Sequence, residues 1–294
     1  MSTRRPSRRR LAAALGWAAA LLLAPACTAP QERRERIEEI DEIWVSEVPD
    51  DSLEEMREEI RALRKIKPDS TEALISVPLL AKQVLSSPSA LVRAESLRAA
   101  WELAASIPSE PLSASPEPAP EFNGWMARFE ELDGSPLDRD GAEIQALTLR
   151  IGGYRFPPSQ ARYAVELATV TVVRAYQRQE SPVQEAFASV APGAVRHALV
   201  LATLQAADDS VDYVREEALL AARHLHPDTA FRRLAASLAS ETDPVLLFAL
   251  LDSVAALGRT EGAEAVAPLL EYASRSSDAA VRRRAQRISE ELEA

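Results

Sequence analysis

Apolar residues recur along the C-terminal half of this 294-residue chain at the spacing of α-helices that bury one face. In 210–225 they are Val211, Val214, Ala218, Ala221 and Leu225, and in 277–293 they are Val281, Ala285, Ile288 and Leu292. Intervals of three and four residues place each set along one side of a helix. The segment between them, 245–257, is apolar on almost every side, which predicts a helix that neighbours cover on several faces.

Capping signals divide the chain into helical hairpins. Asp243 before Pro244 is typical of an N-cap followed by proline in the first turn, and Gly258 is typical of the left-handed residue that ends a helix. The β-branched run 169–173 would suit a strand, but an apolar helical stripe continues through it and favours a helix. The predicted pairs are 72–86 with 89–105, 141–151 with 159–178, 182–206 with 210–225, 228–240 with 243–258, and 262–274 with 277–293.

The same short pattern lies near the start of the second helix in four of these pairs. It is a valine, then arginine or leucine, then a small residue four places after the valine, and it begins at Val92, Val214, Val245 and Val281. The last three starts are 31 and 36 residues apart. This period is typical of arrays in which each hairpin buries its apolar face only against its neighbours. The sequence therefore predicts an all-α protein, an α-α superhelix of about five hairpins.

The Val-Arg-x-x-Ala pattern, preceded by Asp or Ser, resembles the short bacterial form of the HEAT repeat, which also occurs in phycobilisome-lyase-like proteins. The resemblance covers about 182–293 and one unit at 72–105. It implies a HEAT-like solenoid in which the arginine pairs with an acidic residue near a helix start and links one unit to the next. The arginines would be Arg93, Arg215 and Arg282, and the acidic partners Asp212 and Asp278. Leu246 takes the arginine's place in the third unit, which would interrupt such a ladder.

The first 27 residues have the pattern of a bacterial lipoprotein signal peptide. Five arginines precede a 14-residue apolar run at 11–24, which is shorter than the roughly 20 residues that span a bilayer. The following Leu-Ala-Pro-Ala-Cys resembles a lipobox, at which the signal is removed and the cysteine is acylated, although alanine stands where leucine is usual. We predict a signal peptide at 1–26 and lipid attachment at Cys27, the only cysteine. An ordinary secretory cleavage or a retained apolar anchor are the alternatives.

Charge argues against nucleic acid as a partner. Removal of 1–26 leaves 29 basic against 45 acidic side chains, a balance that repels phosphate backbones and anionic headgroups. Membrane contact would then depend on the lipid on Cys27, and stable anchoring takes more than one acyl chain. Thr28 stands where some inner-membrane lipoproteins carry aspartate, which favours the outer membrane, facing the periplasm.

Two segments fall outside the repeat pattern. Residues 27–66 combine the cysteine with dense mixed charge, which predicts a tether and capping helix, or alternatively a partner-binding helix. After the first hairpin at 67–105, the insert 106–140 holds five prolines within 107–120 and predicts an extended spacer. Trp125 and Phe129 follow the prolines, and they would either dock on the array or contact a partner. The remaining repeats occupy 141–294.

Patterns that carry chemistry are sparse. His224, His226 and Asp228 are the one grouping that suggests a metal, but a zinc site takes three or four ligands, and side chains at a helix end commonly bond its free carbonyls. The sequence contains no Gly-x-Ser-x-Gly motif, phosphate-binding glycine loop or His-Glu-x-x-His pair. We therefore predict no catalytic residue, no metal site and no cofactor.

Together these patterns predict a lipid-anchored, non-catalytic helical-repeat scaffold that binds another protein at the cell envelope. Two alternatives remain open. One is an enzyme or cofactor-handling protein of the lyase-like branch, which the family resemblance suggests. The other is a structural envelope lipoprotein that associates with itself through residues 31–66.

Overall fold

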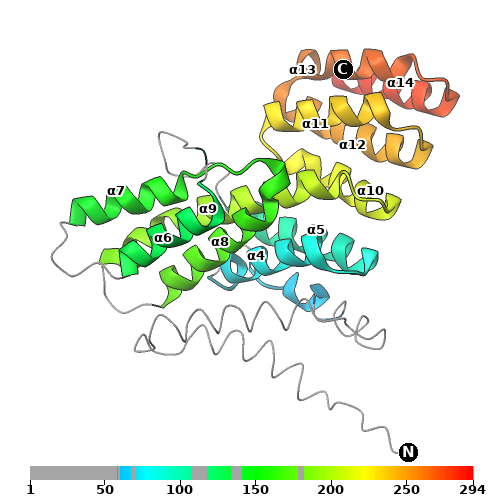
Figure 1. Cartoon of the computed structure of the whole chain (residues 1–294). Coiled ribbons are helices and arrows are strands. Elements are labelled where there is room, and N and C mark those ends of the chain that lie inside the picture. The colour runs from blue at the N-terminus through cyan, green and yellow to red at the C-terminus, as the bar shows by residue number, and fades with distance from the viewer. Residues whose placement is uncertain are drawn as a thin grey trace, which may run out of the picture.

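The computed structural model describes residues 58, 60–67, 71–107, 118, 120–133, 141–177 and 182–293, and within these ranges the protein is all α (Figure 1). No β-strand occurs in the described ranges, where Pro118 and Arg155 form an isolated bridge. The all-α prediction is therefore confirmed for this part of the chain. The signal peptide, Cys27, most of the tether and most of the proline-rich spacer lie outside the described residues.

The helices of the described chain correspond closely to the predicted segments. Three short 3-10 helices, η1 (Ala104–Ser106), η2 (Pro158–Gln160) and η3 (Ala222–His224), adjoin them. The α-helices are α4 (Thr71–Ser86), α5 (Ala90–Leu103), α6 (Phe122–Asp133), α7 (Gly141–Gly152), α8 (Ala161–Tyr176), α9 (Pro182–Ala206), α10 (Asp212–Ala221), α11 (Pro227–Ser240), α12 (Pro244–Glu261), α13 (Ala263–Ser274) and α14 (Ala279–Glu293).

Side-chain caps define the starts of three of these helices. Ser89 before α5, Asp243 before α12 and Asp278 before α14 each accept a hydrogen bond from a backbone N–H of the first turn, at 3.4, 2.7 and 2.7 Å. Such bonds satisfy N–H groups that have no partner within the helix. The predicted N-cap at Asp243 is confirmed.

The predicted end of α12 at Gly258 is wrong. The helix continues to Glu261, and Gly262, with a φ of 96°, is the residue that leaves the helix. Gly258 has a packing role instead, because a Cβ added there would come within 2.5 Å of the Leu292 side chain and 2.9 Å of the Val266 side chain. The glycine thus lets α12 approach α13 and α14 closely.

The β-branched run 169–173 is helical and lies within α8, as predicted. Its two threonines bond to the backbone of the preceding turn: the Thr169 hydroxyl donates to the Val165 carbonyl at 2.8 Å, and the Thr171 hydroxyl donates to the Leu167 carbonyl at 2.7 Å. These bonds satisfy the hydroxyls inside the packed helix, so tertiary burial outweighs the strand propensity of the run.

Helix pairs follow one another in space (Figure 1). α4 pairs with α5, and α5 packs against α10, although α6, α7, α8 and α9 lie between them in the sequence. α10 then packs against α12, and α12 packs against α11, α13 and α14. This consecutive packing fits a helical array, in which α5, α10, α12 and α14 are the second helices of their pairs.

The predicted pairing of 141–151 with 159–178 is wrong. α7 packs chiefly on α9, whereas α8 packs along both α9 and α4. A Cβ on Gly152, at the end of α7, would lie 2.7 Å from the Val190 Cβ on α9, so the two backbones are close at this point. The three helices α4, α7 and α8 therefore surround α9, which explains why α9 is apolar on most sides.

α9 is long and apolar enough, by length and composition alone, to cross a membrane. Of its most apolar stretch, 67% is buried inside the protein. The central position of α9 among other helices therefore accounts for its hydrophobicity.

Candidate functional site

Arg93, near the start of α5, reaches the loop that precedes α10. Its Nε and Nη2 donate to the two carboxylate oxygens of Asp209 at 2.9 and 3.0 Å, and its Nη1 donates to the Ser87 carbonyl at 2.9 Å. The Arg93 and Asp209 side chains are only 14% and 15% exposed. This two-point ion pair joins the α4–α5 pair to the pair beside it in space.

The arrangement recurs one helix pair further along. Arg215 Nη1 donates to the Asp209 carbonyl at 3.0 Å, and Arg215 Nε lies 3.6 Å from Glu241 Oε2, in the loop before α12. Arg215 also pairs with Asp212 at 2.7 Å, as predicted from the sequence. Arg93, Asp209, Arg215 and Glu241 form an alternating series of charges across three helix pairs, which we call the arginine ladder.

The ladder keeps the Asp209 carboxylate ionised. Burial alone would raise the pKa of Asp209, but the hydrogen bonds from Arg93 and from the Val211 N–H outweigh it and lower the pKa below its ordinary value. The carboxylate thus stays charged across the neutral range, and its attraction to both neighbouring arginines is retained.

Arg282 occupies the corresponding place on α14, at the end of the array. Its Nη1 donates to the Ser276 and Ser277 carbonyls at 2.7 and 2.9 Å. Like Arg93 and Arg215, it therefore bonds the carbonyl six residues before it. Asp278, the partner expected from the sequence, caps α14: hydrogen bonds from the Val281 and Ala280 N–H groups, together with the nearby charge of Arg282, lower the pKa of its carboxyl. Among the described residues Arg282 donates its hydrogen bonds to the Ser276 and Ser277 carbonyls, and it donates none to a carboxylate.

The α11–α12 pair has a different register from the one predicted from the Val-Arg pattern. Val92, Val214 and Val281 are fully buried, whereas Val245 is 59% exposed and its neighbour Leu246 is 1% exposed. Leu246 is therefore the equivalent of the three valines, and Leu247, not Leu246, takes the arginine's place and interrupts the ladder. We call the four equivalent residues the anchor positions: Val92, Val214, Leu246 and Val281.

A second set of ion pairs follows the same register. Arg98, six residues after its anchor, donates through Nε to Glu217 at 3.2 Å, and Glu217 stands three residues after the anchor of α10. The same two positions meet between α12 and α14, with the charges exchanged. Asp252 stands six residues after the anchor of α12, Arg284 stands three residues after the anchor of α14, and Arg284 Nη2 donates to Asp252 Oδ1 at 2.7 Å. Equivalent positions thus meet at two interfaces, as expected when units stack with similar geometry.

The predicted partner contacts receive a correction. Trp125 on α6 is fully buried, so it belongs to the core and is not an exposed contact for another protein. Its burial favours docking over an exposed contact for Trp125, and partner binding by the aromatic cluster stays a prediction. The Phe129 side chain lies outside the described part of the structure.

Sequence reasoning missed a buried cationic cluster where α5, α9 and η3 meet. The Arg196 guanidinium lies over the Trp101 ring, 4.3 Å from its centroid, and Trp101 also stacks on His224 at 5.2 Å. Arg196 donates to the Ala104 carbonyl at 3.2 Å and to the His224 carbonyl, and Trp101 Nε1 donates to the Thr203 hydroxyl at 2.9 Å. Because a helix-interior arginine has no local sequence signature, only the fold reveals this cluster.

The electrostatics of this cluster favour neutral histidine. Burial lowers the pKa of Arg196 to about 10, and burial together with Arg223 and Arg196 lowers the pKa of His224 to about 4. His224 stacks on Trp101, and its Nε2 accepts a hydrogen bond from Arg223 at 3.1 Å. Among the described residues, no three His, Cys, Asp or Glu side chains lie together in a way that could hold a metal ion.

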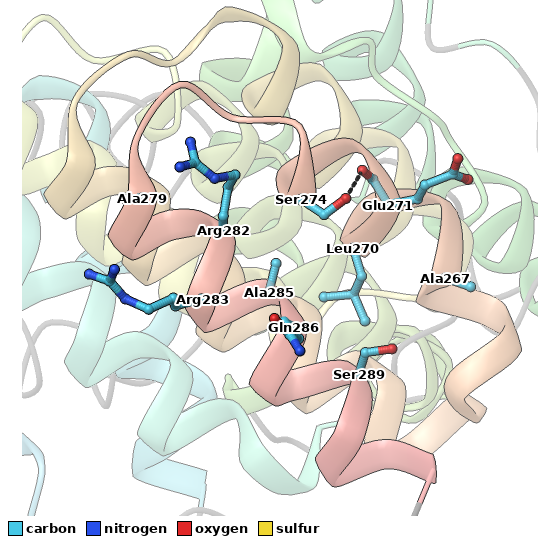
Figure 2. A pocket seen from close by; sticks show the side chains of 10 residues that line it. All are labelled: Ala267, Leu270, Glu271, Ser274, Ala279, Arg282, Arg283, Ala285, Gln286 and Ser289. Carbon is cyan, nitrogen blue, oxygen red and sulfur yellow. Dashed lines mark hydrogen bonds between the residues drawn. The ribbon is translucent and has the colours of Figure 1, made fainter.

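An open groove of about 560 Å³ runs between α13 and α14, the last helix pair of the described array. Leu270 from α13 and Ala285 from α14 form its apolar floor, and Arg282, Arg283 and Gln286 lie along its α14 side. Figure 2 shows Leu270 directed toward Ala285, Gln286 and Ser289, with Arg282 close to the loop that joins the two helices. The groove can accept a polypeptide segment with polar and charged groups.

A comparison of the chain with models of known protein families finds no match, and neither does a comparison with curated proteins.

Proposed function

We propose that the protein is a lipid-anchored, non-catalytic helical-repeat scaffold that binds another protein at the cell envelope. In this proposal the array is a HEAT-like solenoid, and Cys27 is acylated after removal of the signal peptide, on the periplasmic side of a membrane, the outer membrane being favoured. The leader sequence supports the location, and the repeated contacts between second helices support the scaffold.

The observation that carries the proposal is the recurrence of equivalent contacts. Arg93 with Asp209 and Arg215 with Glu241 fix successive helix pairs in the same way, and Arg98 with Glu217 matches Asp252 with Arg284. An array stabilised by contacts between neighbours presents an extended surface, which is the form that repeat proteins use for binding. The interior charges are engaged in linking units, so they support stacking and not a reaction.

The location is tested in the native host by fractionation and by mass spectrometry of the N-terminal peptide. We expect full-length protein in the membrane fraction with acyl chains on Cys27, and a Cys27→Ser variant that is released from the membrane. An unmodified Cys27 thiol in membrane-bound protein would refute lipid attachment.

Partner binding is tested by crosslinking the full chain in intact cells. The scaffold proposal predicts a discrete crosslinked envelope protein, and a Cys27→Ser variant should lose that product because it no longer remains at the membrane. A protein that forms no crosslinked product and turns over a small substrate would instead favour the lyase-like alternative.

A further inference from the structure

The last described helix pair differs from the preceding pairs at two places on the second helices. Five and eight residues after the anchors, three second helices carry apolar residues that are at most 2% exposed. On α14 both places are polar, and both residues line the open groove. Five residues after the anchors stand Leu97, Leu219 and Leu251, and α14 has Gln286 there. Eight residues after the anchors stand Ala100, Ala222 and Val254, and α14 has Ser289 there.

This substitution pattern is that of a terminal unit. A polar outer face prevents another apolar hairpin from stacking there, as the capping units of repeat arrays require. The groove between α13 and α14 is therefore unsuited to burying a purely apolar surface, and its occupant must supply polar groups.

Arg282 indicates that the polar group of the occupant is a carboxylate. Arg93 and Arg215 each use Nη1 for a carbonyl of their own loop and direct Nε to a carboxylate of the following pair. Arg282 has the same Nη1 contacts, so its guanidinium is held in the corresponding way. No helix pair follows α14 among the described residues, and Arg282 itself lines the groove.

We propose that the groove between α13 and α14 binds a loop of the partner protein that carries an aspartate or glutamate, whose carboxylate pairs with Arg282. This inference rests on the proposed function and names the chemistry of the partner. Arg283, which is exposed and lines the same groove, adds positive charge and complements an acidic segment, whereas Glu271 in the same lining is paired with Arg275.

A second copy of this chain is a poor occupant. The residue of the α4–α5 pair equivalent to Asp209 is Ser87, which stands six residues before Arg93 and offers no carboxylate. This pair is also already in contact with residues 60–67, where Arg64 donates to Glu102 on α5. The charge pattern thus favours a different protein.

The test uses two fluorescent peptides and the full-length Cys27→Ser protein. One peptide copies residues 237–248 of this chain, the loop in which Glu241 accepts Arg215, and the other carries glutamine in place of that glutamate. Anisotropy titration is expected to show about fivefold tighter binding of the glutamate peptide, the size of a partly exposed ion pair. Arg282→Gln should abolish this preference, and Arg287→Gln, on the same helix but outside the groove, should retain it.

Equal affinity for the two peptides, binding of neither at millimolar concentration, or an unchanged preference in Arg282→Gln would each overturn the proposal. Should Arg282→Gln unfold the last hairpin, Arg282→Lys keeps the charge but loses the guanidinium fork, and its preference for the glutamate peptide should fall. An envelope partner that crosslinks equally to wild-type and Arg282→Gln protein would refute the groove as the docking site, and the scaffold proposal would still hold. Failure to find any envelope partner would refute the scaffold separately.

Discussion

Arg93 and Asp209 stand 116 residues apart in the sequence, yet their side chains form a two-point ion pair that fixes α5 against the start of α10. The ion pair joins two parts of the chain between which α6, α7 and α8 stand in the sequence. Segments that are distant in sequence thereby become neighbours in the array. Because both side chains are mostly buried, loss of one partner leaves the other poorly solvated.

Asp209→Asn is therefore expected to lower the free energy of unfolding by about 1–3 kcal/mol. A double-mutant cycle with Arg93→Gln, measured by urea denaturation, should give a coupling energy above about 1 kcal/mol. The exposed pair Arg275–Glu271, at 72% and 68% exposure, provides the control, and Arg275→Gln should change stability by less than about 0.5 kcal/mol. Additive effects of the two ladder variants would contradict the assigned role.

The sequence predicted most helices because their apolar positions repeat at three and four residues. It could not predict that α5 packs on α10, since the acids that meet the arginines lie in the loops of the following pair. Asp209 and Glu241 were missed for this reason, although their shared spacing could have marked them: each stands six residues before the arginine position of its own unit, Arg215 or Leu247.

The register of the third repeat illustrates a second limit of sequence patterns. Val245, Leu246 and Leu247 are all apolar, so spacing alone does not decide which of them faces the core. The structure decides it through burial, with Val245 at 59% and Leu246 at 1% exposure. Trp125 is a similar case, because the local sequence around an aromatic residue does not show whether the side chain packs in the core or binds a partner.

Gly152→Ala is expected to destabilise the protein even though alanine is the better helix former. A Cβ at this position would lie 2.7 Å from the Val190 Cβ, a backbone-proximal atom that cannot rotate away, so α7 must move from α9. We expect a loss of about 1–3 kcal/mol in the free energy of unfolding, measured by chemical denaturation.

The double variant Gly152→Ala/Val190→Gly provides the matched control. Val190→Gly removes the Cβ that would lie 2.7 Å from the new one, so the double variant should be more stable than the sum of the single effects predicts. Strict additivity would show that the close contact between α7 and α9 is not the cause.

Arg196→Lys should be strongly destabilising despite retaining the charge. The planar guanidinium lies over the Trp101 ring, 4.3 Å from its centroid, and donates hydrogen bonds to the Ala104 and His224 carbonyls. A lysine ammonium group cannot stack on the ring and also donate to both carbonyls. We expect a loss of about 2–3 kcal/mol in thermal or chemical unfolding. Arg259→Lys, at an exposed position of α12, should remain within about 0.5 kcal/mol of the wild type. Equal effects of the two substitutions would contradict a specific role for the cluster.

The pH dependence of stability should report on His197. Burial, aided by Arg155, lowers the pKa of His197 to about 4, and its Nε2 accepts a hydrogen bond from the Phe156 N–H at 3.3 Å. The unfolded chain has a histidine pKa of about 6.5 and therefore binds more protons than the folded protein between pH 6.5 and 4. Stability contributed by neutral His197 is thus complete above about pH 6.5 and declines as the pH falls toward 4.

His197→Gln keeps an acceptor side chain but does not titrate in this range. Between pH 7 and pH 4.5 the free energy of unfolding of the wild type should fall by on the order of 2 kcal/mol more than that of the variant, as measured by urea denaturation at each pH. The carboxylates and His224 titrate in both proteins, so the difference between the two curves isolates His197. Parallel curves would mean that His197 has the same pKa in the folded and unfolded protein, and the lowered pKa would then be refuted.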